Sequence, residues 1–246
     1  MKKKIFETLL ILFAVYVVGS IIWVVLLALK GLNKVRIVSP ENLPKLEPGM
    51  IIVSNHPDLL NCMYEIFLLP AIFFPQIALH PIKLMPWFTP DKHNFTDKWY
   101  WAWLKPRAIS VQRDNASKGA SEARKMLGVL KEQFGVLVHF IEPGRTCTGK
   151  SFLFSKNKNK KIRTPKSSVG WLALKTESSV WSVWLENGEA PLQPDKKLFS
   201  WPSFSRGSII VKYGKIMEAS AEIGAMSPRE LTGVIAENLL ELADQE

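Results

Sequence analysis

The stretch GMIIVSNHPDLLN, residues 49–61, joins an apolar run to a histidine and then to polar residues. The short run IIV, bounded by turn residues, predicts a buried strand. The strand leads into His56, and Asp58 is placed to cap a helix that follows. Because sites in open α/β sheets gather where strands end, a histidine at this junction is a candidate general base.

The strand-then-helix order of this stretch recurs along the chain, and the last helix begins at a capping box, SPRE, residues 227–230. This alternation predicts an α/β fold: a three-layer domain with a mixed central sheet, preceded by an N-terminal membrane helix. Further strands are predicted over residues 76–79, 108–112, 135–141, 180–186 and 207–214, and further helices over residues 58–69, 117–133 and 169–176.

The N-terminal segment predicts attachment to a membrane. Residues 5–29 carry one charge, Glu7, and as a helix they reach about 37 Å, more than the roughly 30 Å of a hydrocarbon core. The apolar region is too long for a signal peptide, and no small-residue cleavage site follows it. Lysines flank both ends, so two arrangements stay open: a simple span, or a helix within one leaflet. Residues 1–34 are expected to form this membrane-anchoring helix.

The net charge and the cysteine content limit which ligands, partners and metals are expected. A formal charge of +10 suits nucleic acid, anionic lipid headgroups or phosphorylated small molecules. The apolar N-terminus favours membrane lipids among these, and no nucleic acid is expected. Cys62 and Cys147 form no disulfide framework, and neither they nor the scattered histidines have metal-ligand spacing. No metal is expected.

Four predicted strand ends carry polar or charged residues: NHPDLLN, SVQRD, FIEPGRT and VWSVWLEN. The first supplies His56, the second Arg113, and the third Glu142 and Arg145. A guanidinium group pairs with phosphate through a planar fork of N–H donors. Two arginines facing a histidine therefore indicate a phosphorylated substrate beside a general base.

In this order the four segments resemble the motifs of the glycerophospholipid acyltransferases of the 1-acylglycerol-3-phosphate acyltransferase (lysophosphatidate acyltransferase) type. The family's NH-x4-D motif is similar to Asn55-His56 followed by Asn61, and its strand ending in arginine is similar to AISVQRD. Its F-P-E-G-T-R-S motif is similar to FIEPGRT, and its V-P-V strand to VWSV, with Ser182 in place of proline. The resemblance covers roughly residues 33–220.

The resemblance implies an acyltransferase domain over residues 35–246 that uses acyl-CoA or acyl-carrier protein as co-substrate, without a bound cofactor. The acceptor is the free hydroxyl of a lysophospholipid, above all 1-acylglycerol-3-phosphate, and the product is phosphatidic acid. His56 is the implied base, and the enzyme is expected at the cell inner membrane with its domain on the cytoplasmic face. The substrate-binding residues implied by the resemblance are Arg113, Glu142, Gly144, Arg145 and Thr146.

The first motif departs from the family at Asn61, where an aspartate is expected to hold the histidine ring. In serine proteases the equivalent change of aspartate to asparagine lowers the rate by about 10⁴-fold, which is an upper limit for the effect expected here. Asp58, two residues after His56, is an alternative partner for the ring, and otherwise caps the following helix.

Other interpretations stay open at this point. One alternative acceptor is glycerol-3-phosphate or a different lysophospholipid. Another alternative is that the chain is a catalytically weak member of the family that binds phospholipid. The tryptophan-rich residues 99–103 are typical of core or of a membrane interface. The lysine run 156–161 is typical of a solvated loop, or of a contact with anionic lipid or acidic acyl-carrier protein. GRTCTGKS, residues 144–151, also satisfies the P-loop pattern, which requires a helix directly after it.

Overall fold

A computed structural model describes most of the chain. The described residues are 2–56, 68–90, 97, 99–111, 116–132, 135–142, 150–157, 159–187 and 208–245.

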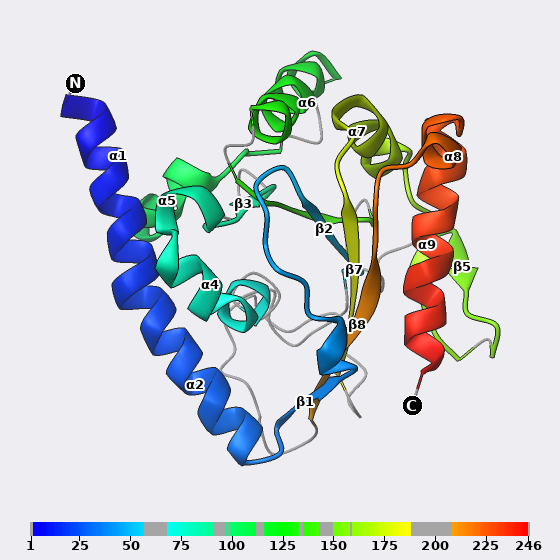
Figure 1. The fold of residues 1–246 in the computed structure, drawn as a ribbon, viewed down its shortest axis with the longest axis horizontal. Coiled ribbons are helices and arrows are strands. Elements are labelled where there is room, and N and C mark those ends of the chain that lie inside the picture. The colour runs from blue at the N-terminus through cyan, green and yellow to red at the C-terminus, as the bar shows by residue number, and fades with distance from the viewer. Residues whose placement is uncertain are drawn as a thin grey trace.

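A six-stranded mixed sheet forms the centre of the molecule (Figure 1), with strand order β1-β8-β7-β2-β4-β3. Only the β7–β8 pair is antiparallel; the other neighbours are parallel. A separate antiparallel hairpin is formed by β5 and β6. The strands are β1 (Val35–Val38), β2 (Ile51–Ser54), β3 (Trp87–Phe88), β4 (Leu137–Phe140), β5 (Phe152–Phe154), β6 (Lys161–Arg163), β7 (Val180–Asn187) and β8 (Ile209–Met217).

Helices cover both faces of this sheet, so the predicted three-layer α/β fold is confirmed. Successive side chains of a strand point to opposite faces, and in β2 Ile52 packs on the side of the N-terminal helix while Ile51 and Val53 pack on the other. The first side carries α1 (Lys2–Phe13), η1 (Ala14–Gly19), α2 (Ser20–Gly31), α4 (Phe74–Leu79) and α5 (Pro81–Leu84). The second side carries α6 (Ala116–Lys131), α7 (Ser168–Thr176) and α9 (Pro228–Asp244). Further helices are η2 (Pro40–Asn42), η4 (Trp99–Arg107) and α8 (Ala221–Gly224), and residues 68–72 are helical as well.

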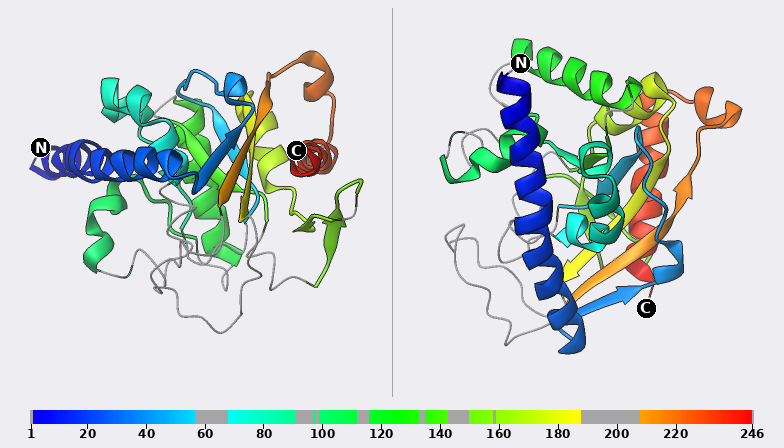
Figure 2. Two further views of the ribbon diagram at one scale, coloured as in Figure 1. Left: turned by 90° about the horizontal axis from the view of Figure 1, so that it is seen from below. Right: turned by 60° about the vertical axis from the view of Figure 1, so that its left-hand side comes forward.

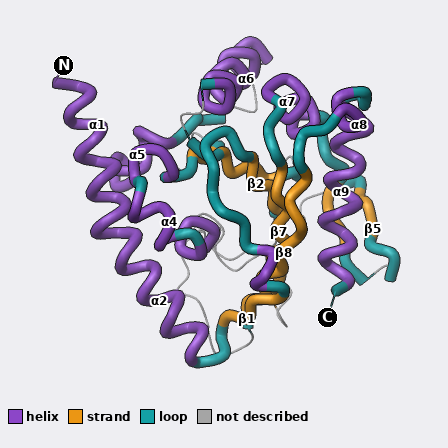
Figure 3. Tube along the Cα trace, viewed as in Figure 1, coloured by secondary structure: helices purple, strands orange, loops and turns teal. Residues whose placement is uncertain are grey.

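The α1–η1–α2 segment is one continuous helix, and η1 is a π-helical turn within it (Figure 3). Residues 4–31 of this helix are long and apolar enough to cross a membrane. The helix nevertheless lies along the domain, because α1 contacts α5 and η4, and η1 contacts α4. The N-terminal helix therefore packs against the domain and does not extend away from it (Figure 2).

Local chemistry accounts for the helices on the opposite face. The hydroxyl of Ser227 accepts the N–H of Glu230, and the Glu230 carboxylate accepts the N–H of Ser227 at 2.7 Å, so the predicted capping box starts α9. At Gly170 in α7 an added Cβ would lie 2.2 Å from the Pro228 carbonyl oxygen. A glycine there lets α7 approach the start of α9 closely.

Two predicted strands differ in the structure. Residues 76–79 belong to α4, because Pro75 suits the first helical turn and the N–H groups of Gln76 and Ile77 bond the Phe73 carbonyl. A four-residue apolar run does not separate strand from helix by itself. Of the predicted strand at 108–112, the described part makes an isolated bridge between Ala108 and Phe88, and the N–H of Val111 donates to the Pro90 carbonyl at 2.9 Å.

Candidate functional site

The carboxyl ends of three neighbouring parallel strands meet at one edge of the sheet. Ser54, the last residue of β2, lies beside Phe140 of β4 and Val183 of β7. The N–H of Ile141 continues the ladder to the Ser54 carbonyl at 3.0 Å. The residues that follow β2 and β4 are therefore brought together although more than eighty positions separate them in the sequence.

Asn55 connects the end of β2 to β7 through two hydrogen bonds. Its side-chain amide donates to the Leu185 carbonyl at 2.9 Å, and its amide oxygen accepts the Leu185 N–H at 2.8 Å. Asn55 is buried, so this pair of bonds replaces water for both groups. Asn55 was not predicted as a site residue, although the first motif places it directly before the candidate base.

His56 follows directly and is held by β4. Its backbone N–H donates to Glu142 Oε1 at 2.7 Å, and its ring stacks on Phe140 with centroids 4.8 Å apart and planes 27° apart. Stacking limits the tilt of the imidazole, and the backbone bond fixes the position from which the ring extends.

Glu142 is 4% exposed and joins three segments. While Oε1 accepts the His56 N–H, Oε2 accepts the backbone N–H of Arg163 in β6 at 2.7 Å. Hydrogen bonds to a carboxylate are stronger than those between neutral groups. The sequence predicted that Glu142 orients an arginine or the substrate; the structure adds these two backbone contacts, which the motif alone did not indicate.

Most other predicted site residues fall outside the described ranges. Their proposed roles stay predictions. They are Asp58, Asn61, Arg113, Gly144, Arg145 and Thr146. In the part of the chain that the structure describes, no group of three or more His, Cys, Asp and Glu side chains is arranged to hold a metal ion.

The P-loop interpretation is wrong. A P-loop opens a helix directly after its lysine and serine. Here the residues after Ser151 form β5, and the Ser151 hydroxyl lies 2.7 Å from the Thr164 hydroxyl across the hairpin. The segment that follows Lys150 is thus half of a β-hairpin, which offers no helix N-terminus to a nucleotide phosphate.

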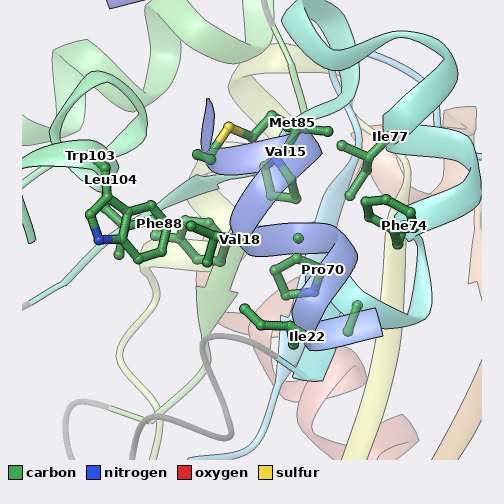
Figure 4. Close-up of a pocket in the computed structure, with 14 residues that line it drawn as sticks. Val15, Val18, Ile22, Pro70, Phe74, Ile77, Met85, Phe88, Trp103 and Leu104 are labelled. Carbon is green, nitrogen blue, oxygen red and sulfur yellow. The ribbon is translucent and has the colours of Figure 1, made fainter. Parts of the chain in front are cut away.

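An apolar pocket lies between the N-terminal helix and the domain (Figure 4). The π-helical turn forms one wall, and the hydroxyl of Tyr16 within it donates to the Ala78 carbonyl at 2.9 Å. The Trp23 and Phe74 rings pack 5.4 Å apart beside it. The walls labelled in the figure are Val15, Val18, Ile22, Pro70, Phe74, Ile77, Met85, Phe88, Trp103 and Leu104.

Comparison with solved structures gives several matching chains. The chain is similar to the crystal structure of the 1-acyl-sn-glycerophosphate (LPA) acyltransferase PlsC from Thermotoga maritima, with 18% sequence identity and a TM-score of 0.46. The match covers 99% of this chain and 100% of that one. No family model and no curated protein matches the chain. A likeness of this size says nothing about the substrate of this chain.

Proposed function

We propose that this protein is a membrane-associated O-acyltransferase that moves a fatty acyl group from an acyl thioester to the hydroxyl of a lysophospholipid. The observation that carries the proposal is His56, held at the strand ends by Glu142 and stacked on Phe140. The order of the four motif segments along the sequence supports the acceptor, 1-acylglycerol-3-phosphate, with phosphatidic acid as product.

His56 acts as the general base in this proposal. The imidazole takes the proton of the acceptor hydroxyl while the oxygen attacks the thioester carbonyl, forming a C–O bond and a tetrahedral oxyanion. The oxyanion collapses, the C–S bond breaks, and the imidazolium returns the proton to the leaving thiolate. No acyl-enzyme and no bound cofactor is required, because the acceptor attacks the co-substrate directly.

Glu142 positions the base rather than exchanging a proton. Its two carboxylate oxygens receive the backbone N–H groups of His56 and Arg163, which holds the loop after β2 against the β5–β6 hairpin. Contact with the acceptor phosphate falls to Arg113 and Arg145, because guanidinium groups pair with phosphate through two bonds. Gly144 and Thr146 complete the proposed substrate-binding segment.

The N-terminal helix supports membrane attachment within one leaflet. One side of the helix is buried on the domain, at Ile11, Ala14, Val15 and Leu26. The opposite side exposes large apolar residues, among them Phe6, Leu9, Phe13, Ile21 and Val24. Neighbouring elements expose Leu79, Ile82 and Trp99 as well.

A helix with one apolar face on protein and the other exposed is suited to lie in the interface plane. This arrangement also accounts for lysines at both ends, since neither end has to cross the bilayer. We place the domain on the cytoplasmic face of the inner membrane, and we assign the apolar pocket beside the helix to an acyl chain.

The test is acyl transfer from labelled acyl-CoA, and separately from acyl-carrier protein, to 1-acylglycerol-3-phosphate in detergent. We expect His56→Ala to lower the rate by about 10²- to 10⁴-fold, the usual contribution of a general base. His80→Ala is the matched control, because His80 is exposed at the start of α5. Equal rates for wild type and His56→Ala would remove His56 from the mechanism.

The acceptor is tested in the same assay with glycerol-3-phosphate and with lysophospholipids of larger headgroup. Preference for one of these would reassign the acceptor, and equal rates on all of them would contradict the phosphate clamp. A chain that binds phospholipid but transfers nothing from either donor would be a binding protein on this fold, which the asparagine at position 61 would explain.

A further inference from the structure

The β5–β6 hairpin supplies the Arg163 N–H that Glu142 accepts, yet it is separate from the central sheet. Its two strands, of three residues each, pair with each other in a two-stranded sheet. A two-stranded hairpin by itself is only marginally stable in water. The position of the Arg163 N–H therefore depends on the contacts that hold the hairpin against the rest of the domain.

The β6 side of the hairpin is held by a buried side chain and an ion pair. Ile162 is fully buried and belongs to the apolar cluster to which α7 and α9 contribute. Lys160, directly before β6, forms an ion pair with Glu186 in β7. These two contacts attach one strand of the hairpin to the sheet and to the helices that cover it.

The turn between the two strands is held by Asp244, the last residue of α9, which lies beside the hairpin (Figure 1). The carboxylate accepts the Asn157 N–H at 3.1 Å, and it also accepts hydrogen bonds from the Ser155 hydroxyl and the Lys156 N–H. Ser155 is buried, and its hydroxyl oxygen accepts the Lys160 N–H at 3.3 Å. One carboxylate thus connects α9 to both ends of the turn.

The Asp244 carboxylate is ionised at neutral pH. Burial raises the pKa of this carboxyl, but the hydrogen bonds from the turn outweigh burial and bring the pKa below its ordinary value. The bonds to the turn are therefore charge-assisted, which makes them stronger than bonds between neutral groups. By contrast, Lys156 and Glu241 form an ion pair at 2.7 Å that is exposed on both sides, and such pairs contribute little.

A carboxylate at the last position of a helix lies at the negative end of the helix dipole, so local preference does not explain Asp244. Lys212 of β8 compensates for it. Lys212 is 5% exposed, and its ammonium donates to the carbonyls of Ala243, at 2.8 Å, and of Gln245. The buried cation offsets the dipole and fixes the last turn of α9, from which the Asp244 carboxylate reaches the hairpin.

The path from the turn to the candidate base is short. The Ser155 N–H donates to the Lys160 carbonyl at 2.9 Å, and Arg163 lies three residues farther along, or roughly 10 Å in a strand. The N–H groups of Arg163 and His56 each donate to one oxygen of Glu142 at 2.7 Å. A shift of the hairpin must therefore break the bond from Arg163 or move the carboxylate that holds His56.

We propose that Asp244 is a positioning residue for His56, acting through the β5–β6 hairpin and Glu142. The inference rests on the proposed function, since it concerns the same base. Asp244 fixes the turn, the hairpin fixes the Arg163 N–H, and Glu142 links that N–H to His56. Removal of the Asp244 carboxylate should lower kcat and leave KM unchanged, because the substrates still bind while the base is less well placed.

The test is acyl transfer from labelled acyl-CoA to 1-acylglycerol-3-phosphate by Asp244→Ala and Asp244→Asn. We expect kcat to fall by about 3- to 10-fold in Asp244→Ala, the scale of one lost hydrogen bond, with both KM values unchanged. Asp244→Asn keeps an oxygen acceptor for the turn and should lose less. Glu237→Gln, at an exposed carboxylate about two turns earlier in α9, is the matched control and should have the kcat of wild type.

Two kinetic results would overturn the proposal. One is a kcat in Asp244→Ala equal to that of wild type. The other is an equal loss in Asp244→Asn and Glu237→Gln, because the effect would then follow the net charge of α9 and not the hydrogen bonds at the turn.

Amide hydrogen exchange in detergent gives a second readout, which does not depend on catalysis. In Asp244→Ala the amides of Arg163 and His56 should exchange about 3- to 10-fold faster than in wild type, because their shared acceptor is less well held. The Leu137 amide, which donates to the Met50 carbonyl at 2.9 Å in the central sheet, should exchange as in wild type. Equal acceleration at Leu137 would indicate a general loosening of the fold and would contradict a positioning role.

The two readouts separate failure of the positioning role from failure of the proposed function. Faster exchange at His56 in Asp244→Ala, in a protein that transfers no acyl group, would keep the link between Asp244 and the loop after β2 and remove the acyltransferase. Transfer that is lost in His56→Ala, with kcat and exchange unchanged in Asp244→Ala, would keep the acyltransferase and remove the role of Asp244.

Discussion

The backbone N–H of His56 and the buried carboxylate of Glu142 form a 2.7 Å hydrogen bond between the ends of two adjacent parallel strands. The same carboxylate bonds the N–H of Arg163 in a separate hairpin. The position of the candidate base therefore depends on a side chain that follows β4. The loop after β2 cannot shift without breaking this charge-assisted hydrogen bond.

Replacing Glu142 should therefore slow transfer without removing the base. In Glu142→Gln one oxygen still accepts an N–H, while the new amide group faces the second donor. Loss of a charged hydrogen bond costs about 1.5–3 kcal/mol, so we expect kcat to fall by about 10- to 100-fold. Acyl transfer in Glu142→Gln, compared with Glu132→Gln at the exposed end of α6, checks this. Unchanged kcat at Glu142 would show that its backbone contacts do not position His56.

Asn55 makes a different prediction, on stability. Its amide both donates to and accepts from the Leu185 backbone, whereas an aspartate accepts only and brings a buried charge. We expect Asn55→Asp to lower the free energy of unfolding by about 2–4 kcal/mol, and Asn55→Ala by about 1–3 kcal/mol. Urea denaturation followed by circular dichroism measures both. If Asn55→Asp were as stable as wild type, the two hydrogen bonds between Asn55 and Leu185 would contribute nothing to the stability of the fold.

We expect acyl transfer to become faster when a carboxylate replaces the amide at position 61. If the ring of His56 uses that position, Asn61→Asp should raise kcat, by no more than about 10⁴-fold. Asp58→Ala in the natural background tests the alternative partner. Loss of activity in Asp58→Ala with no gain in Asn61→Asp would assign the ring to Asp58, and no effect of either would leave His56 without a carboxylate partner.

His139 predicts a pH dependence of stability. Burial lowers the pKa of its imidazole from 6.5 to about 4, and its Nε2 lies 3.3 Å from the Ser168 hydroxyl. The folded state holds the ring neutral, so the unfolded state binds the extra proton between these two values. Stability should be complete above pH 6.5 and should fall as the pH drops toward 4, by about 3 kcal/mol at most.

The measurement for His139 is the free energy of unfolding of wild type and His139→Leu from pH 7.5 to 4. Carboxylates contribute to both curves, so the difference between them isolates the histidine. We expect that difference to change below pH 6.5. His80→Ala, at an exposed histidine, should follow the wild-type curve. Parallel curves for wild type and His139→Leu would contradict a depressed pKa.

The strand and helix pattern predicted the layers well, because it depends on local periodicity. The capping box of α9, the strand β2 and the helix α7 are where their residues indicate. Residues 76–79 were assigned wrongly, since a short apolar run has no period and Pro75 decided the outcome.

The candidate site was only half predictable, for a physical reason. The motifs named His56 and Glu142, but not that a carboxylate would bond a backbone N–H, because backbone partners leave no mark in a motif. A polar pocket lined by Arg36, Lys160 and Lys212 was missed because these cations come from β1, β8 and the segment before β6, which only the tertiary fold brings together. Lys212, between Val211 and Tyr213 in β8, was a local sign of it.

Docking of the N-terminal helix on the domain predicts that both of its ends face the same side of the membrane. Cys62 and Cys147 are first replaced by serine, and Lys4→Cys or Lys30→Cys is then added. In sealed inverted vesicles, where the cytoplasmic face is outside, an impermeant maleimide should label both variants to the same extent. A helix within one leaflet requires this, because neither end crosses the hydrocarbon core. Labelling of Lys30→Cys alone, with Lys4→Cys labelled only after detergent is added, would demonstrate a spanning helix and require the helix to leave its contacts with α5 and η4.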